Sequence, residues 1–273
     1  MDIIIRSEDC TEVWDGVLYK KLSDYPNITS WELRTLAEFA AYERRNGRKC
    51  TLHCDDEILK ARILSAMEEP EPWLHVSKPA LLAECTACPV RKGCETAFVC
   101  HTTSPESAKA ILQCGELLSA VKARGLSGQE LARESRNAAC DPPDYFDYVM
   151  FTWGNCQGGD RLVTERRLGR FPTEEELSGS FEPGVRFYFR YETLAKHPGA
   201  TFDGVLPMKV RDGVKVADYA CAIIIPKSLR REMEPCIPAN LLSRVMYIEN
   251  DCADIWEWSE KVYRCVEKKY AGE

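Results

Sequence analysis

The chain has 273 residues, of which 45% are hydrophobic and 29% are charged, with a formal net charge of −7 and a pI near 5.4. This length allows one large domain or two modest ones, and the lack of an apolar run of about eighteen residues excludes a membrane-spanning helix. The acidic balance argues against binding bulk nucleic acid through the overall electrostatic field. Because the opening residues, MDIIIRSEDC, lack a basic segment followed by a long apolar one, we expect no signal peptide and a cytoplasmic protein.

The first hundred residues are predicted to be mostly helical, after a short opening strand in MDIIIRSED. One helix begins at the capping-box pair Thr29 and Glu32, and its leucines and alanines recur at helical spacing. A second helix has Asp55 or Asp56 as its N-cap. A third is predicted within KPALLAEC, which ends at Cys85.

The pattern changes after Cys100. Ser104 is the predicted N-cap of a helix that ends at Gly115, and a capping-box pair, Ser127 and Glu130, opens another. Several segments rich in β-branched and aromatic residues are then predicted to be strands: DYVMFTW, VRFYFRY, GVLPMKV, DYACAIIIP and RVMYIEN. A final amphipathic helix is predicted within ADIWEWSEKVYRCVEKKY.

These elements favour an α+β fold. The strands do not alternate regularly with long helices, so a mixed or antiparallel sheet with flanking helices is preferred over a doubly wound parallel sheet. We predict a helical metal-binding domain over residues 1–97 and a sheet domain over residues 98–273, with the boundary where the composition changes. The arginine-rich segment DRLVTERRLGRF is expected to be a solvated helix face rather than a basic groove.

A cysteine cluster carries the clearest chemistry. Cys85, Cys88 and Cys94 follow one another in the pattern C-x2-C-x5-C and require a fourth ligand. Without a secretory signal, clustered thiols indicate metal binding rather than a disulfide framework. Cys54, Cys50 and Cys100 are the candidates for the fourth position, and both zinc and a cubane iron–sulfur cluster accept four thiolates.

The segment CTACPVRKGC resembles the C-x2-C-P-V-R-x2-C signature of WhiB-like iron–sulfur proteins. In that family another ligand lies about thirty residues upstream, and Cys54 stands thirty-one positions before Cys85. The resemblance therefore implies a [4Fe–4S] cluster held by Cys54, Cys85, Cys88 and Cys94, with zinc as the alternative. It covers only about forty residues and lacks the glycine–tryptophan turn and basic tail of the family, so it implies no transcriptional role.

Directly after the cysteines, FVCHTTSPESAKAILQCGEL combines an apolar strand, His101-x-Thr103 and a capped helix. This resembles the opening of ADP-ribosyltransferase-fold proteins, and among them the DarT-like transferases and tRNA 2′-phosphotransferases. The resemblance implies that His101 and Thr103 bind NAD at a strand end. The aromatic strand expected to line the nicotinamide pocket is DYFDYVMFTWGN, through Tyr148 and Phe151.

The family also places an acidic residue at the start of a later strand, where VADYACAIIIP offers Asp218. A carboxylate there stabilises the oxocarbenium-like ribosyl cation and accepts a proton from the nucleophile. The family normally uses glutamate, so the shorter aspartate departs from its pattern. By the resemblance, the catalytic residues are Asp218 and His101.

Two classes of function follow. The first is an NAD-dependent ADP-ribosyltransferase that carries a cysteine-ligated cluster and modifies a nucleic acid or a protein, with no membrane partner. The second is a sensor or binding module without catalysis, in which an iron–sulfur or zinc centre holds the N-terminal helices together. The sharper cysteine motif favours the second, and the order of histidine, aromatic and acidic motifs favours the first.

Overall fold

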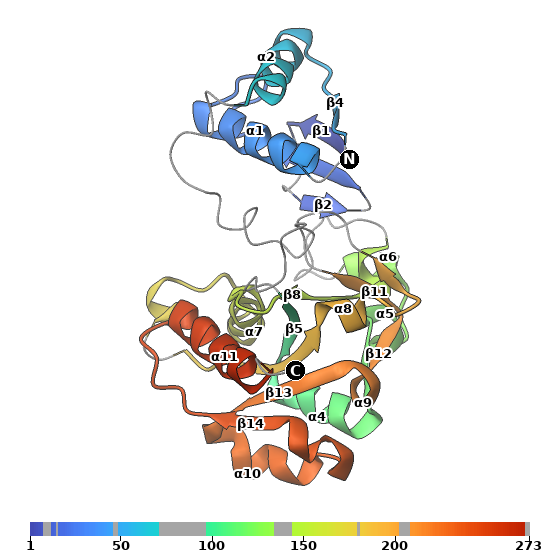
Figure 1. Cartoon of the computed structure of the whole chain (residues 1–273), viewed down its shortest axis with the longest axis vertical. Coiled ribbons are helices and arrows are strands. Elements are labelled where there is room, and N and C mark those ends of the chain that lie inside the picture. The colour runs from blue at the N-terminus through green and yellow to red at the C-terminus, as the bar shows by residue number, and fades with distance from the viewer. Residues whose placement is uncertain are drawn as a thin grey trace. The chain divides into compact units, whose positions relative to one another are not determined.

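The computed structural model describes residues 1–7, 12–14, 16–45, 49–70, 97–133, 144–178, 181–201 and 208–270. They separate into two compact units, residues 1–70 and residues 97–270 (Figure 1). Both units combine helices with sheets, so the fold is α+β as predicted. None of the helices in these described ranges has the length and apolar character needed to cross a bilayer.

The first unit contains a four-stranded mixed sheet of order β2-β3-β1-β4. Its strands are β1 (Asp2–Arg6), β2 (Glu12–Trp14), β3 (Val17–Lys21) and β4 (Thr51–His53). Strand β1 lies parallel to β3 and β4, whereas β2 runs antiparallel to β3. The prediction of a helical domain is therefore wrong for these residues. The opening strand in MDIIIRSED is confirmed as β1, whereas β2, β3 and β4, with three to five residues each, are too short to show a period in the sequence.

Two helices, α1 (Ser30–Arg45) and α2 (Glu57–Glu68), pack against each other in this unit. Both begin as predicted, because Glu32 closes a capping box with Thr29 and Asp56 accepts a hydrogen bond from the Leu59 N–H. The apolar residues of the helices and of one sheet face form a single buried core: Ile3, Ile5, Leu18, Leu33, Leu36, Leu52, Leu59, Ile63 and Met67.

The second unit is built on a five-stranded sheet of order β14-β13-β9-β5-β8. Its strands are β5 (Phe98–Thr103), β8 (Thr152–Trp153), β9 (Val185–Arg190), β13 (Ala220–Pro226) and β14 (Val245–Ile248). Only the β13–β14 pair is parallel among these neighbours, so the predicted mixed, mostly antiparallel sheet is confirmed.

The second unit also contains two smaller sheets. One has the order β10-β11-β7 and the other pairs β12 with β6. Their strands are β6 (Glu116–Leu118), β7 (Tyr148–Met150), β10 (Ala200–Thr201), β11 (Lys209–Arg211) and β12 (Gly213–Lys215). The segment DYVMFTW, predicted as one strand, is thus divided between two sheets, because Met150 pairs with β11 and Thr152 pairs with β5.

Helices cover the five-stranded sheet. The long C-terminal helix α11 (Ile255–Tyr270) packs its apolar side on Cys100, Tyr188 and Ile224, as its amphipathic pattern predicted (Figure 1). The other helices are α4 (Pro105–Cys114), α5 (Ala120–Arg124), α6 (Gly128–Ala132), α7 (Gly158–Leu168), α8 (Tyr191–Leu194), α9 (Val216–Tyr219) and α10 (Arg230–Met233). Short 3₁₀ turns cover Tyr145–Asp147, Glu175–Leu177, Lys227–Leu229, Glu234–Cys236 and Ala239–Arg244.

Candidate functional site

His101 lies in β5 of the five-stranded sheet, next to residues 150–152, where the chain passes into this sheet from the three-stranded one. Its Nδ1 is 2.9 Å from the carbonyl oxygen of Met150, the last residue of β7. A carbonyl only accepts hydrogen bonds, so Nδ1 carries the proton and Nε2 is left as an acceptor. The ring is partly buried. The His101 Nε2 atom is therefore the group that this side chain offers to a ligand.

The environment of His101 favours its neutral form. Burial lowers the pKa of His101 below the ordinary value of 6.5, and the positive charge of Arg166 lowers it further. The hydrogen bond to the Met150 carbonyl opposes this shift without reversing it. At neutral pH the imidazole is thus an uncharged hydrogen-bonding group rather than a cation.

An aromatic wall stands beside His101. The Phe151 ring meets it edge-on with centroids 6.1 Å apart, and Phe151 also packs against Phe189 at 5.1 Å. Because residues alternate along a strand, His101, Phe187 and Phe189 share one face of the sheet, opposite Cys100 and the helix α11. Of the aromatic residues predicted to line the site, Phe151 lies next to the histidine.

The other two predicted NAD-binding residues have different surroundings. Thr103 is buried at the end of β5, on the same strand face as His101. The Tyr148 ring instead packs under the Lys209 ammonium, at 4.6 Å from the ring centroid, and the Arg211 guanidinium, at 5.5 Å. The Tyr148 ring thus packs against two cations of β11.

Asp218 is not brought beside His101. It lies in the short helix α9, before β13, rather than in the strand as predicted. His101 is opposite Phe187, which is opposite Ile223, so two strand spacings, roughly 10 Å, separate β5 from β13. Ala220 precedes Ile223 by about 10 Å along the strand, and Asp218 lies beyond Ala220.

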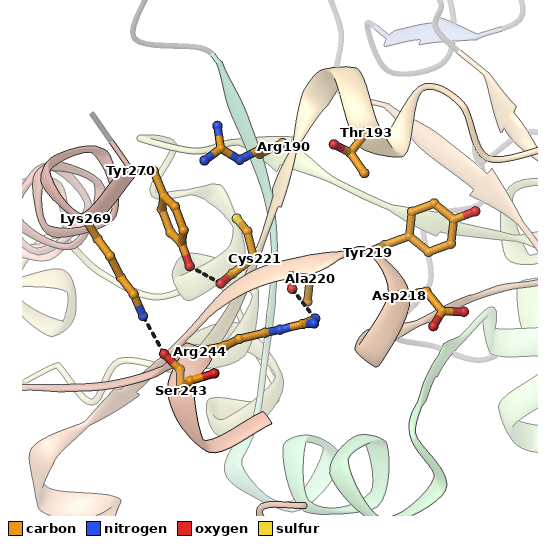
Figure 2. A pocket seen from close by; sticks show the side chains of 10 residues that line it. All are labelled: Arg190, Thr193, Asp218, Tyr219, Ala220, Cys221, Ser243, Arg244, Lys269 and Tyr270. Atoms are coloured by element: carbon orange, nitrogen blue, oxygen red, sulfur yellow. Dashed lines mark hydrogen bonds between the residues drawn. The ribbon is translucent and has the colours of Figure 1, made fainter. Parts of the chain in front are cut away.

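Asp218 instead lines a cavity of about 410 Å³ next to the C-terminal end of α11. Figure 2 shows its side chain with those of Arg190, Arg244 and Lys269, which come from β9, from the turn before β14 and from α11. Asp218 is exposed and forms no ion pair with any residue that the structure describes. The predicted carboxylate and the predicted histidine therefore belong to two separate places on the sheet.

Of the four predicted metal ligands, Cys54 is the one that lies among the described residues. Cys54 follows β4, is 8% exposed, and directs its thiol at the Asp56 carbonyl, 3.6 Å away. Burial raises the pKa of this thiol, so without a metal it is protonated. Cys85, Cys88 and Cys94 lie outside the described residues, and among those described no three His, Cys, Asp or Glu side chains converge on a metal position.

Cys100, the alternative fourth ligand, is fully buried in β5. Its sulfur is 3.2 Å from the Thr152 hydroxyl, and burial raises its pKa to about 11. Cys50 is partly buried against the core of the first unit. Of these three thiols, Cys54 and Cys50 belong to the same unit, whereas Cys100 belongs to the other.

Sequence reasoning missed two sets of residues. Arg186 and Asp160 form a buried ion pair, and the only sequence signal was an arginine within the apolar segment VRFYFRY. The cations of the cavity gave no signal, because they are distant in sequence and converge only in the fold.

No protein-family model, no curated protein sequence and no solved structure matches this chain.

Proposed function

We propose that residues 97–270 form an NAD-consuming transferase of the ADP-ribosyltransferase type, with His101 as the residue that binds the nucleotide. The observation that carries the proposal is the hydrogen bond between His101 Nδ1 and the Met150 carbonyl beside Phe151. It holds a neutral imidazole at the meeting point of two sheets, with Nε2 available to accept a hydrogen bond. A ribose hydroxyl of NAD is the donor that suits this acceptor, and an aromatic ring such as Phe151 suits the nicotinamide.

The reaction breaks the bond between the nicotinamide nitrogen and C1′ of its ribose. Nicotinamide leaves with the bonding electrons, and the oxocarbenium-like ribosyl group is attacked at C1′ by an acceptor nucleophile that gives up its proton. His101 would orient the ribose by hydrogen bonding, and Phe151 would exclude water from the reacting carbon. A carboxylate is needed to stabilise the cation. Asp218 was predicted for this role from the family pattern. Because it lies apart from His101, the effect of replacing Asp218 on nicotinamide release is measured separately from the effect of replacing His101.

For the first unit we propose a metal centre held by Cys54, Cys85, Cys88 and Cys94, as a [4Fe–4S] cluster in preference to zinc. The support is the cysteine spacing together with the position of Cys54, a buried thiol between β4 and the N-terminus of α2. A ligand at that position would tie the sheet and the helix of this unit to the cysteine segment. When bound, the group supplies folding free energy.

Labelled NAD tests the transferase proposal directly. The full chain is incubated with NAD labelled in its adenylate phosphate, and with single-stranded DNA, RNA or a protein extract as the acceptor. Nicotinamide release and label transfer are both measured. We expect His101→Ala to reduce nicotinamide release at least tenfold or so, the cost of losing one strong hydrogen bond to the substrate.

His53→Ala is the matched control, because His53 belongs to the first unit and its side chain is 55% exposed. Equal release by the His101→Ala and wild-type proteins would overturn the proposal. No release of nicotinamide by a wild-type protein that retains its metal would favour the sensor without catalysis.

A further inference from the structure

The cavity beside the C-terminal end of α11 has a charge opposite to that of the whole protein. Its lining contains three cationic side chains, Arg190, Arg244 and Lys269, and one carboxylate, Asp218 (Figure 2). Three positive charges and one negative charge give the lining a formal charge of +2, whereas the chain as a whole carries −7. A positive concavity on an acidic protein concentrates anions locally.

Two of these cations are held in place by uncharged groups. Arg244 Nη1 donates hydrogen bonds of 2.7 Å to the carbonyls of Ala217 and Ala220, and Lys269 Nζ donates one of 2.8 Å to the Ser243 carbonyl. Within the described ranges neither cation has a carboxylate partner, and Nε and Nη2 of Arg244 make no hydrogen bond. The carbonyls orient both side chains but do not neutralise their charge.

We propose that this cavity binds a phosphate-bearing small molecule. Arginine presents a planar fork of N–H donors that matches phosphate oxygens, and lysine adds a compact point charge. Thr193 belongs to the same lining, and its hydroxyl offers a further donor. The volume of about 410 Å³ is within the range of small-molecule sites, about 300–1,000 Å³, and suits a diphosphate or a nucleotide.

The cations of this cavity are separate from His101, the residue that carries the proposed transferase function. The Arg190 guanidinium lies 5.8 Å from the Phe98 ring and 4.9 Å from the Tyr270 ring, on the sheet face that α11 covers. His101 projects from the opposite face of the same sheet. Replacing Lys269 therefore leaves His101 and its surroundings unchanged, and replacing His101 leaves the three cations unchanged.

Calorimetric titration of the full chain with inorganic pyrophosphate tests the proposal. We expect saturable binding that weakens as salt is raised from about 50 to 300 mM, because the interaction is between charges. Lys269→Gln is expected to weaken it about tenfold, the effect of losing one charge-assisted hydrogen bond. Lys268→Gln, the same change at the adjacent exposed residue, which is not part of the lining, is expected to leave the affinity within about twofold.

Competition experiments distinguish the kind of ligand, and a melting temperature identifies a variant that does not fold. Displacement of pyrophosphate by ADP would support the site. Displacement by adenosine, which has no phosphate, would overturn the assignment to a phosphate-bearing ligand. Citrate that binds as tightly as pyrophosphate would overturn it as well. Arg244→Gln removes the contacts at the end of α9, so its melting temperature is measured first; if it unfolds, Lys269→Gln alone decides. The proposal fails if wild-type protein binds no pyrophosphate at millimolar concentration, or if Lys268→Gln and Lys269→Gln weaken binding equally. Nicotinamide release by Lys269→Gln is measured alongside and is expected to be unchanged.

Discussion

The Arg186 guanidinium and the Asp160 carboxylate form an ion pair in which both side chains are 0% exposed. Arg186 Nε lies 2.8 Å from Asp160 Oδ2, and its other nitrogens donate to the Ser259 and Tyr188 hydroxyls at 2.5 and 3.2 Å. The second oxygen of Asp160 accepts a hydrogen bond of 2.8 Å from the Gly184 N–H. Through this network α7, β9 and α11 are joined at one buried point behind the strand that carries His101.

Replacing one partner of this pair should be strongly destabilising. Asp160→Asn leaves the Arg186 charge buried without a counter-charge, and we expect the free energy of unfolding to fall by about 3–5 kcal/mol. The exposed pair between Arg167 and Glu182, whose carboxylate side chain is 78% exposed, provides the control. Glu182→Gln should cost less than about 1 kcal/mol. Urea denaturation followed by circular dichroism measures both, and similar losses for the two variants would contradict the assignment.

Two adjacent glycines at the start of α7 should respond very differently to alanine. A Cβ added at Gly159 would lie 2.4 Å from Thr102 Oγ1 and 2.5 Å from Thr102 Cβ, so helix and strand would have to separate. We expect Gly159→Ala to cost about 1–3 kcal/mol. At Gly158 the nearest atom is the Cys156 sulfur at 3.3 Å, so Gly158→Ala should be close to neutral. Thermal melts of the two variants decide, and equal melting temperatures would refute the close approach at Gly159.

Glu32 should make stability depend on pH in the acid range. Burial raises the pKa of Glu32, but hydrogen bonds from the Thr29 and Ser23 backbone N–H groups outweigh it and bring the pKa to about 2. The folded state thus favours the ionised form relative to the unfolded chain, where the value is about 4.3. The stabilisation is present above pH about 4.3 and is lost as the pH falls towards 2.

Glu32→Gln is expected to lower stability by about 1 kcal/mol at pH 7, the usual effect of losing a capping interaction. The gap from wild type should narrow between pH about 4.3 and 2, measured by urea denaturation. Glu57→Gln, at an 81% exposed side chain, is the control. A gap that stays constant over this range would rule out the ionised cap.

The contribution of His101 to stability should also decrease as the pH falls, but at a higher pH than that of Glu32. Burial lowers its pKa in the folded protein, so the unfolded chain takes up this proton first as the pH falls below about 6.5. The contribution of His101 to stability is therefore present above pH 6.5 and is lost below it. The difference in unfolding free energy between wild type and His101→Gln, followed from pH 7.5 to 5, isolates this residue from the other histidines. A wild type that gains stability relative to the variant on acidification would show a protonated imidazole and would exclude the neutral acceptor.

Local signals in the sequence predicted local structure. Ser104 caps α4, Gly115 ends it in a left-handed conformation, and Ser127 closes a capping box with Glu130, all as expected. Each of these interactions spans a few residues, so the sequence contains both partners. The strand at β9 was likewise evident from its β-branched and aromatic composition.

Contacts between distant segments could not be predicted in this way. Asp160 and Arg186 are 26 residues apart, and nothing near either one signals the other. Phe151 donates its N–H to the Met208 carbonyl, a contact that turns one apparent strand into two. Asp218 precedes an apolar run and was expected to begin the strand, but it lies in the helical turn α9. Arg244, 24 residues beyond Ala220, donates to the carbonyls of Ala217 in that turn and of Ala220 directly after it. The sequence thus predicted elements that depend on neighbouring residues, and it did not predict the cavity at which β9, α9 and α11 converge.

The cysteine segment allows a sharp test of the metal proposal. Cys94→Ser and Cys54→Ser each remove one of the four proposed thiolates, so protein purified without oxygen should lose its iron and sulfide, or its zinc, and the visible absorbance of a cluster. Cys100→Ser is the matched control, because its thiol is buried beside Thr152 in β5 and belongs to the other unit. Cys50→Ser tests the alternative upstream ligand.

The His101→Ala protein should keep its full metal content while it loses nicotinamide release, since a strand residue of the second unit takes no part in the thiolate set. Iron, sulfide and zinc are measured per chain for all five variants and for the wild type. Wild-type protein without any bound metal would end the proposal of a metal centre. Metal lost from Cys100→Ser but retained in Cys54→Ser would move the fourth ligand into β5, which would tie the metal centre to the strand that carries His101 instead of to the core of the first unit.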